Sequence, residues 1–193
     1  MTLSDGIKSF AVQPAPVSDD PGSPRRHDRT RSHPTPGAEN SLYRWWRARN
    51  PLRVALQVVV ILLARYVPHM GLKNWLYRRL GMTVGPGAAF AFEATPDLLW
   101  PDRITVEEGA IVGYDATILC HEYLQAEYRL GEVTIGERAM IGAGAVVLPG
   151  VAVGADAQVA ANSLVAEDVP PGTTVAGVPA EPVDREHGVG GDE

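Results

Sequence analysis

Between residues 135 and 169 a branched aliphatic side chain recurs at every sixth position. The residues that open these repeats are Ile135, Ile141, Val147, Val153, Val159 and Val165. A small or compact residue follows each of them four positions later: Ala139, Ala145, Val151, Ala157, Ser163 and Val169. Six residues turn an α-helix by about 600°, which would scatter the aliphatics around its surface. A coiled strand uses this period, because one aliphatic per short face points inward and small residues fit the corners.

The same period recurs upstream, where it is interrupted twice. Three further repeats open on Val106, Val112 and Ile118, and an earlier one opens on Val84. The phase breaks at 91–105 and again at 124–134, so we expect both stretches to leave the coil as loops. In repeat proteins such insertions tend to gather on the binding face.

The pattern divides the chain into four regions. Residues 1–40 are rich in Pro, Ser, Asp and Arg and have few large apolar side chains, so we expect them to be disordered. Residues 41–81 form a basic and apolar helical segment, and residues 82–180 form an all-β domain, a parallel β-helix. Residues 181–193 are an acidic, Gly-rich tail that we expect to fray.

Within the helical segment, the stretch Val54–Val67 is apolar except for Gln57 and Arg65. At about 1.5 Å per residue it is shorter than the ~30 Å apolar layer of a membrane, so it cannot span one. An aromatic and arginine-rich run at 43–49 precedes it, a mixture suited to a headgroup interface. A second helix is expected at Leu72–Leu80. The two helices pack on the coil or a sister subunit, or they make peripheral membrane contact, and both can hold.

The charge of the chain is unevenly distributed. Its 193 residues carry a net charge of −6, yet residues 41–80 hold eight cations and no Asp or Glu. Residues 81–193, with four basic and eighteen acidic side chains, carry −14. Such an acidic coil argues against nucleic-acid binding, and the basic segment suits a different surface.

Cysteine usage and the first residues indicate the compartment. Cys120 is the single cysteine of the chain, which rules out an internal disulfide and fits a reducing environment. The N-terminus has neither the basic flank nor the apolar run of a signal peptide. We therefore expect a cytoplasmic protein, with a peripheral position on the inner membrane face if the helical segment contacts lipid.

His121 is the candidate for chemistry. It is the one histidine of residues 82–180, and it stands where the second excursion leaves the coil. An imidazole there can take a proton from an alcohol near neutral pH, as general base catalysis requires. From the residues alone, a polar corner side chain without a catalytic role is the competing interpretation.

Six short motifs surround these positions: Leu80–Gly85, Ile118–Tyr123, Val133–Gly136, Val147–Val151, Asp168–Gly172 and Ala176–Ala180. Together they resemble the hexapeptide-repeat acyltransferases, near the maltose, galactoside and exopolysaccharide O-acetyltransferases. The resemblance covers residues 72–180, over half of the chain. It implies a left-handed β-helix, a homotrimer, and acetyl-CoA lying in the groove between the coils of adjacent subunits.

The resemblance also implies roles for single residues. His121 matches the catalytic base that deprotonates a sugar hydroxyl for direct attack on the thioester. A carboxylate from the following loop orients that base in relatives, and Glu127 is the candidate here, with Glu122 in reserve. Asp97 matches an acidic position expected to hold the acceptor. Cofactor contacts are expected at the following positions: Ala143, Ala161, Ala166 and Pro179.

Two features depart from the family pattern. Relatives commonly carry basic residues near Ala166 and after Pro179, where they suit the CoA phosphates, whereas this chain has Glu167 and Glu181. These acids should weaken cofactor binding unless Arg138 or the helical arginines compensate. Cys120 lies beside the base where relatives often have Thr or Ser, and we interpret it as a small wall residue rather than a nucleophile.

Several functions remain open. The first is an acetyl-CoA-dependent O-acetyltransferase acting on a sugar or a saccharide precursor. The alternatives are acetylation of an antibiotic or other small hydroxyl compound, and a non-catalytic β-helix scaffold. A zinc enzyme of the same coil shape would need three convergent histidines, and the coil contains His121 alone.

Overall fold

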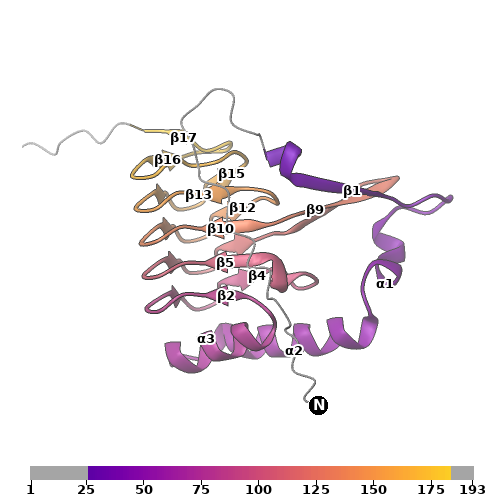
Figure 1. Ribbon diagram of the computed structural model, residues 1–193, viewed down its shortest axis with the longest axis horizontal. Helices are drawn as coiled ribbons and strands as arrows, with labels where there is room; N and C mark the ends of the chain where they lie inside the picture. Colours follow the sequence, from indigo (N-terminus) through magenta and orange to yellow (C-terminus); the bar gives the residue numbers. More distant parts are fainter. Residues whose placement is uncertain (1–25, 184–193) are drawn as a thin grey trace, which may run out of the picture.

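The computed structural model describes residues 26–183. Most of that chain winds into a coil with three faces of parallel strands (Figure 1). Face 1 contains β2 (Thr83–Val84), β5 (Ile104–Val106), β10 (Val133–Ile135) and β13 (Ala152–Val153). Face 2 contains β3 (Ala89–Phe90), β6 (Ile111–Val112), β11 (Met140–Ile141), β14 (Gln158–Val159) and β16 (Thr174–Ala176). Face 3 contains β4 (Thr95–Pro96), β7 (Thr117–Ile118), β12 (Val146–Val147) and β15 (Leu164–Val165).

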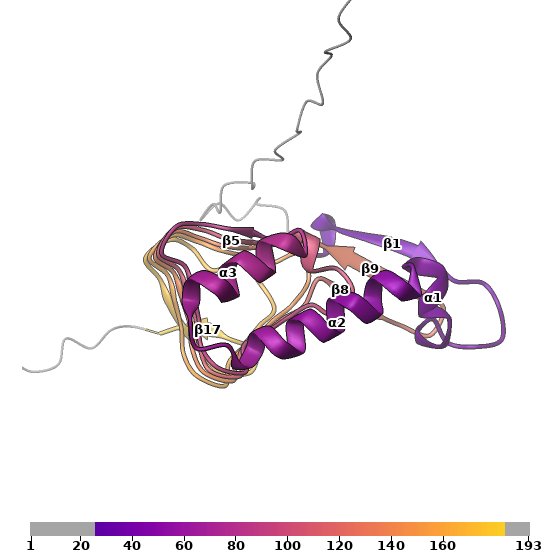
Figure 2. The ribbon, with the colours of Figure 1, turned by 90° about the horizontal axis from the view of Figure 1, so that it is seen from below.

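The chain visits the three faces in the same order on every turn, which confirms the parallel β arrangement predicted from the six-residue period. Seen from below, the successive turns superimpose as a three-sided outline (Figure 2). At the far end β17 (Glu181–Pro182) pairs antiparallel with β16 and ends the second face.

The predicted aliphatics form the interior of the coil. Each of the six side chains that open a repeat between 135 and 165 is at most 1% exposed. The small residues four positions later, such as Ala145, are buried at the corners. Gly142 shows why a residue without a side chain follows an aliphatic, because a Cβ there would lie 2.5 Å from the Ala161 nitrogen of the next turn.

The N-terminal end of the coil is covered by the helical segment (Figure 2). It comprises η2 (Leu42–Arg44), α1 (Trp45–Ala48), α2 (Pro51–Tyr66) and α3 (Met70–Arg79). α2 starts earlier than predicted because the Asn50 side chain accepts hydrogen bonds from two backbone N–H groups and Pro51 suits the first helical position. Among the described residues, no helix is long and apolar enough to cross a membrane.

A buried polar group joins these helices to the first turn of the coil. Lys73 on α3 is fully buried, and its Nζ donates to the carbonyls of Phe90 and Ala91 at 2.9 and 3.1 Å. Burial lowers the pKa of Lys73. Beside it the Tyr77 and Phe90 rings meet edge to face, with their centroids 4.8 Å apart. The end of the coil is therefore closed by packed side chains.

The expectation of disorder over residues 1–40 is wrong for residues 26–40, and residues 1–25 lie outside the described part. η1 (Arg26–Arg29) leads into β1 (Thr30–Pro34), which pairs antiparallel with β9 (Glu127–Gly131). β9 in turn pairs with β8 (His121–Tyr123), which gives a three-stranded sheet extending from one side of the coil (Figure 1). Backbone hydrogen bonds to β9 order this polar segment, which has no apolar face of its own.

Candidate active site

The two interruptions of the repeat leave the coil at the same corner, between face 3 and face 1. The first spans residues 97–103 after β4 and includes η3 (Pro101–Arg103), and the second spans 119–132 after β7 and contains the hairpin β8–β9. β4 and β7 are neighbours in face 3, with Pro96 opposite Ile118. The residues that follow these two strands therefore lie side by side, although they belong to different turns of the coil.

This register brings Asp97 and His121 together. The Asp97 Oδ2 and His121 Nδ1 atoms are 2.5 Å apart. The Asp97 side chain is fully buried, whereas the His121 side chain remains 17% exposed. The buried carboxylate thus holds the imidazole at Nδ1, while part of the His121 side chain is exposed to solvent.

Asp97 is fixed by further hydrogen bonds from the backbone. Its Oδ1 accepts from the N–H groups of Leu99 and Trp100, both at 2.9 Å, and its Oδ2 accepts from Cys120 at 2.7 Å. Burial alone would raise the pKa of Asp97, but the bonds from His121 and the backbone outweigh it, so the pKa lies below its usual value. An ionised Asp97 can only accept, so His121 Nδ1 must donate and Nε2 is left as the proton acceptor.

Asp97 thus has the orienting role that the sequence assigned to Glu127, and this corrects both assignments. Asp97 is buried and satisfied within the chain, so it offers no free oxygen to an acceptor. The carboxylate of Glu127 contacts Ser32, and it also accepts from Arg129 Nε at 2.8 Å. Glu122, the reserve candidate, accepts from Arg26 at 2.7 Å instead.

Aromatic side chains surround His121, a feature that sequence reasoning missed. The Trp100 ring centroid lies 5.0 Å from that of His121, and the Tyr123 centroid lies 5.1 Å away. Tyr128 stacks on Trp100 at 5.9 Å, and His33 from β1 stacks on Tyr128 at 4.8 Å. This aromatic cluster (Trp100, Tyr123, Tyr128 and His33) restricts the positions that the imidazole can take.

One polar group of the cluster has no partner. The Tyr123 hydroxyl is buried without a hydrogen bond to any described residue. Burial raises the pKa of Tyr123, so the hydroxyl keeps its proton and can act as a donor. Alternation along the hairpin could have indicated this residue, since Tyr123 lies two positions after His121 on the same face.

Cys120 is the buried neighbour of the base. Burial raises the pKa of its thiol well above the usual value, and the nearby Asp97 charge acts in the same direction. A thiol that keeps its proton is a poor nucleophile. This supports the interpretation of Cys120 as a wall residue, and its backbone N–H has the more specific contact, with Asp97.

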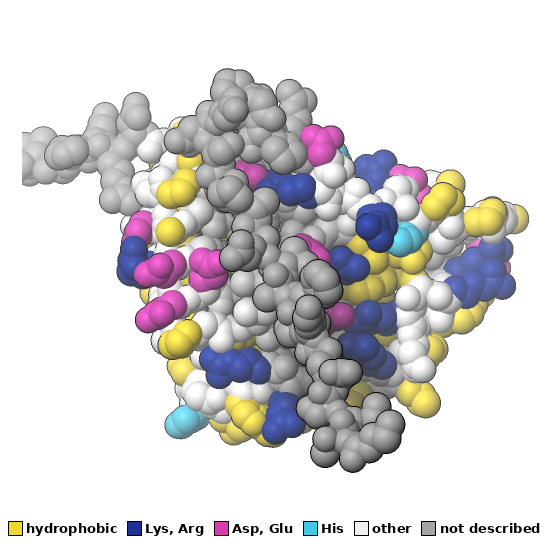
Figure 3. Space-filling model, in the orientation of Figure 1, with side chains coloured by type: hydrophobic (Ala, Val, Ile, Leu, Met, Phe, Trp, Pro, Cys, Tyr) yellow, Lys and Arg dark blue, Asp and Glu magenta, His cyan; other side chains and the backbone are white. Residues whose placement is uncertain are grey.

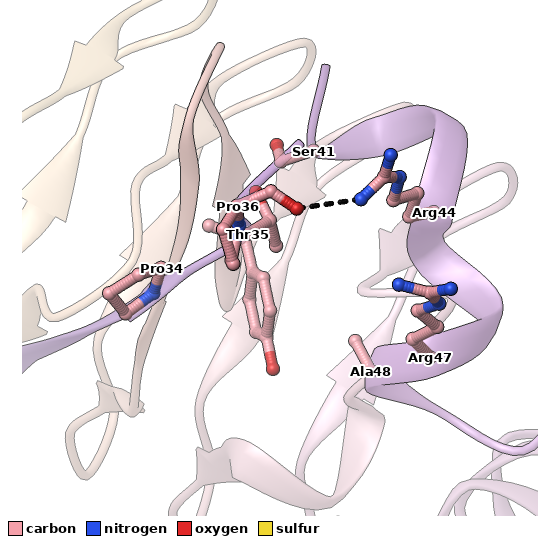
Figure 4. Close-up of a pocket in the computed structure, with 8 residues that line it drawn as sticks. Pro34, Thr35, Pro36, Ser41, Arg44, Arg47 and Ala48 are labelled. Atoms are coloured by element: carbon pink, nitrogen blue, oxygen red, sulfur yellow. Dashed lines mark hydrogen bonds between the residues drawn. The ribbon is translucent and has the colours of Figure 1, made fainter. Parts of the chain in front are cut away.

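A cavity of about 260 Å³ adjoins the aromatic cluster. Tyr128 lines it from β9, the segment Pro34–Pro36 from the end of β1, and Arg44, Arg47 and Ala48 from η2 and α1 (Figure 4). Arg44 donates to the Pro36 carbonyl at 2.7 Å and pairs with Glu39. Arg47 has no ion pair among the described residues, so the cavity offers an uncompensated positive charge.

Two of the expected cofactor positions share a corner at the opposite edge of face 3. Ala143 and Ala161 lie in successive turns of the coil, and the Asn162 N–H donates to the Ala143 carbonyl at 2.8 Å. Both alanine side chains are exposed, and neither N–H has a backbone acceptor within residues 26–183. Free N–H groups beside small side chains fit an extended amide-bearing group such as pantetheine.

The other expected cofactor positions lie further along the coil. Ala166 is half-buried after β15, and Pro179 is exposed between β16 and β17. Arg138 is not available to compensate for the acids there, because it pairs with Asp156 and Glu137. A cation reaches this part of the coil from the N-terminal segment instead, because Arg29 pairs with Asp168.

A three-faced coil of six-residue repeats with a carboxylate-oriented histidine at one corner defines a class, the hexapeptide-repeat enzymes. Within the described residues no group of three metal-binding side chains could hold an ion. A family model, bacterial transferase hexapeptide (six repeats), matches residues 132–167.

Known proteins agree with this class. The putative acetyltransferase YvoF of Bacillus subtilis is 47% identical over 152 residues, which are 78% of this chain and 88% of that protein. A putative acetyltransferase of Staphylococcus aureus (strain MSSA476) is 36% identical over 132 residues, 68% of this chain and 82% of that protein. The chain belongs to the hexapeptide-repeat acyltransferase family and is an acyltransferase.

Solved structures share the fold at lower identity. A hexapeptide-repeat acetyltransferase from Vibrio cholerae has a TM-score of 0.54 and 20% identity, covering 69% of this chain and 90% of its own. A galactoside acetyltransferase in complex with coenzyme A has a TM-score of 0.53 and 18% identity, covering 69% and 80%. These likenesses support the coil architecture.

Proposed function

We propose that this protein is an acetyl-CoA-dependent O-acetyltransferase in which His121 is the general base and a sugar or saccharide precursor is the acceptor. The single observation that carries the proposal is the hydrogen-bonded Asp97–His121 pair, with Asp97 buried and His121 partly exposed, at the corner where both excursions leave the coil. The names of the B. subtilis and S. aureus relatives support acetyl transfer. The coil is left-handed, as in the family that the sequence resembles.

In this mechanism His121 Nε2 takes the proton of the acceptor hydroxyl while the oxygen of that hydroxyl attacks the thioester carbonyl. Negative charge then develops on the carbonyl oxygen, where a backbone N–H can stabilise it. The C–S bond breaks, the acetyl group stays on the acceptor oxygen, and the imidazolium returns its proton to the CoA thiolate. Asp97 keeps its charge throughout and stabilises the imidazolium, as carboxylate partners of catalytic histidines do.

The acceptor and the cofactor need different surfaces. Ala143 and Ala161 lie at one edge of face 3 and His121 at the other, so we assign the cofactor to a groove that a neighbouring coil completes in a homotrimer. The acceptor is assigned to the side of the hairpin, where part of the His121 side chain is exposed. The cavity beside Tyr128 takes the remainder of the acceptor, and Arg47 there favours one with a phosphate or carboxylate.

The test measures release of free CoA from acetyl-CoA by the full chain, with a panel of mono- and oligosaccharides as acceptors. His121→Ala should lower kcat by about 10²-fold or more, because a positioned base contributes at least that much. His69→Asn is the matched control, since His69 caps α3 away from this corner and Asn preserves a cap. Turnover of His121→Ala within about tenfold of the unmodified protein would contradict the assignment.

The same panel separates the alternatives. Transfer to small hydroxyl compounds such as antibiotics, with no transfer to any saccharide, would replace the proposed acceptor class and leave the mechanism intact. Absence of transfer to every acceptor by a folded protein would contradict the proposed acceptor class.

A further inference from the structure

α2 has apolar side chains on two opposite sides. One side faces the coil, and its residues Val54, Gln57, Ile61 and Ala64 are buried. The other side is open: Leu52, Leu56, Val59, Leu63 and Tyr66 are 82, 64, 54, 65 and 58% exposed. These five residues are spaced three or four apart, so they form one continuous row along the helix. We call them the outer row.

The outer row lies at the end of the molecule. α2 and α3 together cover the N-terminal end of the coil, so a row opposite the buried side of α2 points away from the coil (Figure 2). Two tryptophans of the helical segment are also exposed, Trp46 on α1 at 45% and Trp75 on α3 at 48%. An exposed apolar surface of this extent marks a binding site rather than ordinary solvent contact.

Basic side chains border this surface, and acids are absent from its sequence. Residues 41–80 contain eight cations and no Asp or Glu. Three arginines of α2 and α3 are exposed: Arg53, Arg78 and Arg79. In Figure 3 the lower margin of the molecule, where α2 and α3 lie, carries hydrophobic and basic side chains.

We propose that the outer row docks this end of the protein on an anionic lipid membrane surface, with α2 lying flat in the interface. Apolar residues would enter the acyl boundary, tryptophans would sit at headgroup depth, and arginines would contact lipid phosphates. The charge distribution favours this occupant over a second copy. Two such ends facing each other would oppose like charges with no acid of residues 41–80 between them. The side-by-side arrangement of a trimer leaves the coil ends free.

The experiment uses the full chain and two kinds of vesicle, phosphatidylcholine alone and phosphatidylcholine with phosphatidylglycerol. Sedimentation should show binding about tenfold or more tighter to the anionic vesicles, weakening as salt is added. Leu63→Glu should lower the affinity by about tenfold or more, because it removes one leucine that enters the lipid in the proposed docking and adds a charge of the wrong sign. Ile111→Glu makes a comparable change at a 46% exposed position of face 2 and should leave binding unchanged.

Mass and turnover complete the test. Leu63→Glu should keep the oligomeric mass of the unmodified protein and its rate of acetyl transfer in solution. Vesicle binding is measured without turnover, so its result does not depend on the proposed catalytic function. Failure of the unmodified protein to bind anionic vesicles at low salt would overturn the proposal, and so would equal binding by Leu63→Glu. A change of mass in Leu63→Glu without vesicle binding would assign the outer row to a subunit contact instead.

Discussion

The coil has two kinds of corner, and they are used differently. Between faces 2 and 3 the chain turns within four residues, as at 142–145 and 160–163, and successive turns touch. Between faces 3 and 1 it leaves the coil twice, at 97–103 and 119–132. The first kind keeps the strands in register. The second uses that register to place a carboxylate and an imidazole from different turns within hydrogen-bonding distance.

The pairing of strands in the repeat therefore determines which loop residues meet at the site. Asp97 and His121 are 24 residues apart in the chain, yet they meet because β4 and β7 are neighbours. The N-terminal segment adds to the second kind of corner alone: β1 extends the hairpin, and Arg26 donates to Glu122 and to the Pro149 carbonyl.

The largest expected effect is on the regular part. Ile141→Asp places an unpaired carboxylate in the interior and should lower the free energy of unfolding by about 4 kcal/mol or more. Met140→Asp is the matched control one position away, where the side chain is 38% exposed, and it should cost about 1 kcal/mol or less. Urea unfolding followed by circular dichroism measures both. Similar losses for the two variants would contradict the inward and outward alternation.

The next effect separates the two candidate carboxylates. Asp97→Asn removes the charge behind His121 and no longer fixes the proton on Nδ1, so kcat should fall by about 10²-fold or more. Glu127→Gln should leave kcat nearly unchanged, because this carboxylate contacts Ser32 and Arg129 instead. Steady-state kinetics and melting temperatures of both variants distinguish catalysis from folding. A larger kcat loss in Glu127→Gln would restore the role that the sequence suggested.

The smallest effect is on acid stability. The pKa of Asp97 is lowered in the folded protein, so folding favours its ionised form. Its contribution to stability is complete above the ordinary Asp pKa of about 3.9 and is lost as the pH falls through the lower folded value. The melting temperature should therefore drop in that acidic window, with a shallower drop in Asp97→Asn. Parallel curves for the two proteins would show that this corner makes no contribution.

The coil and His121 could be predicted from the sequence because they depend on local spacing. The orienting acid could not, because an interrupted repeat hides which strands are neighbours, and Glu127 lies closer to His121 in the chain. β1 was missed for a related reason. Its sequence, Thr30 to Pro34, is polar and its partner β9 is about a hundred residues away, so no periodic signal marks it.

Asp97 and His121 come from neighbouring turns of the coil, and this has a consequence for how such proteins can change length. Neighbouring strands lie about 4.8 Å apart whatever the total number of turns. Whole turns can therefore be gained or lost beyond β15 without altering the geometry of the acid and the base. Such a change would instead alter the length of the groove that we propose for the cofactor, so the length of this groove can change while the acid and the base stay in place.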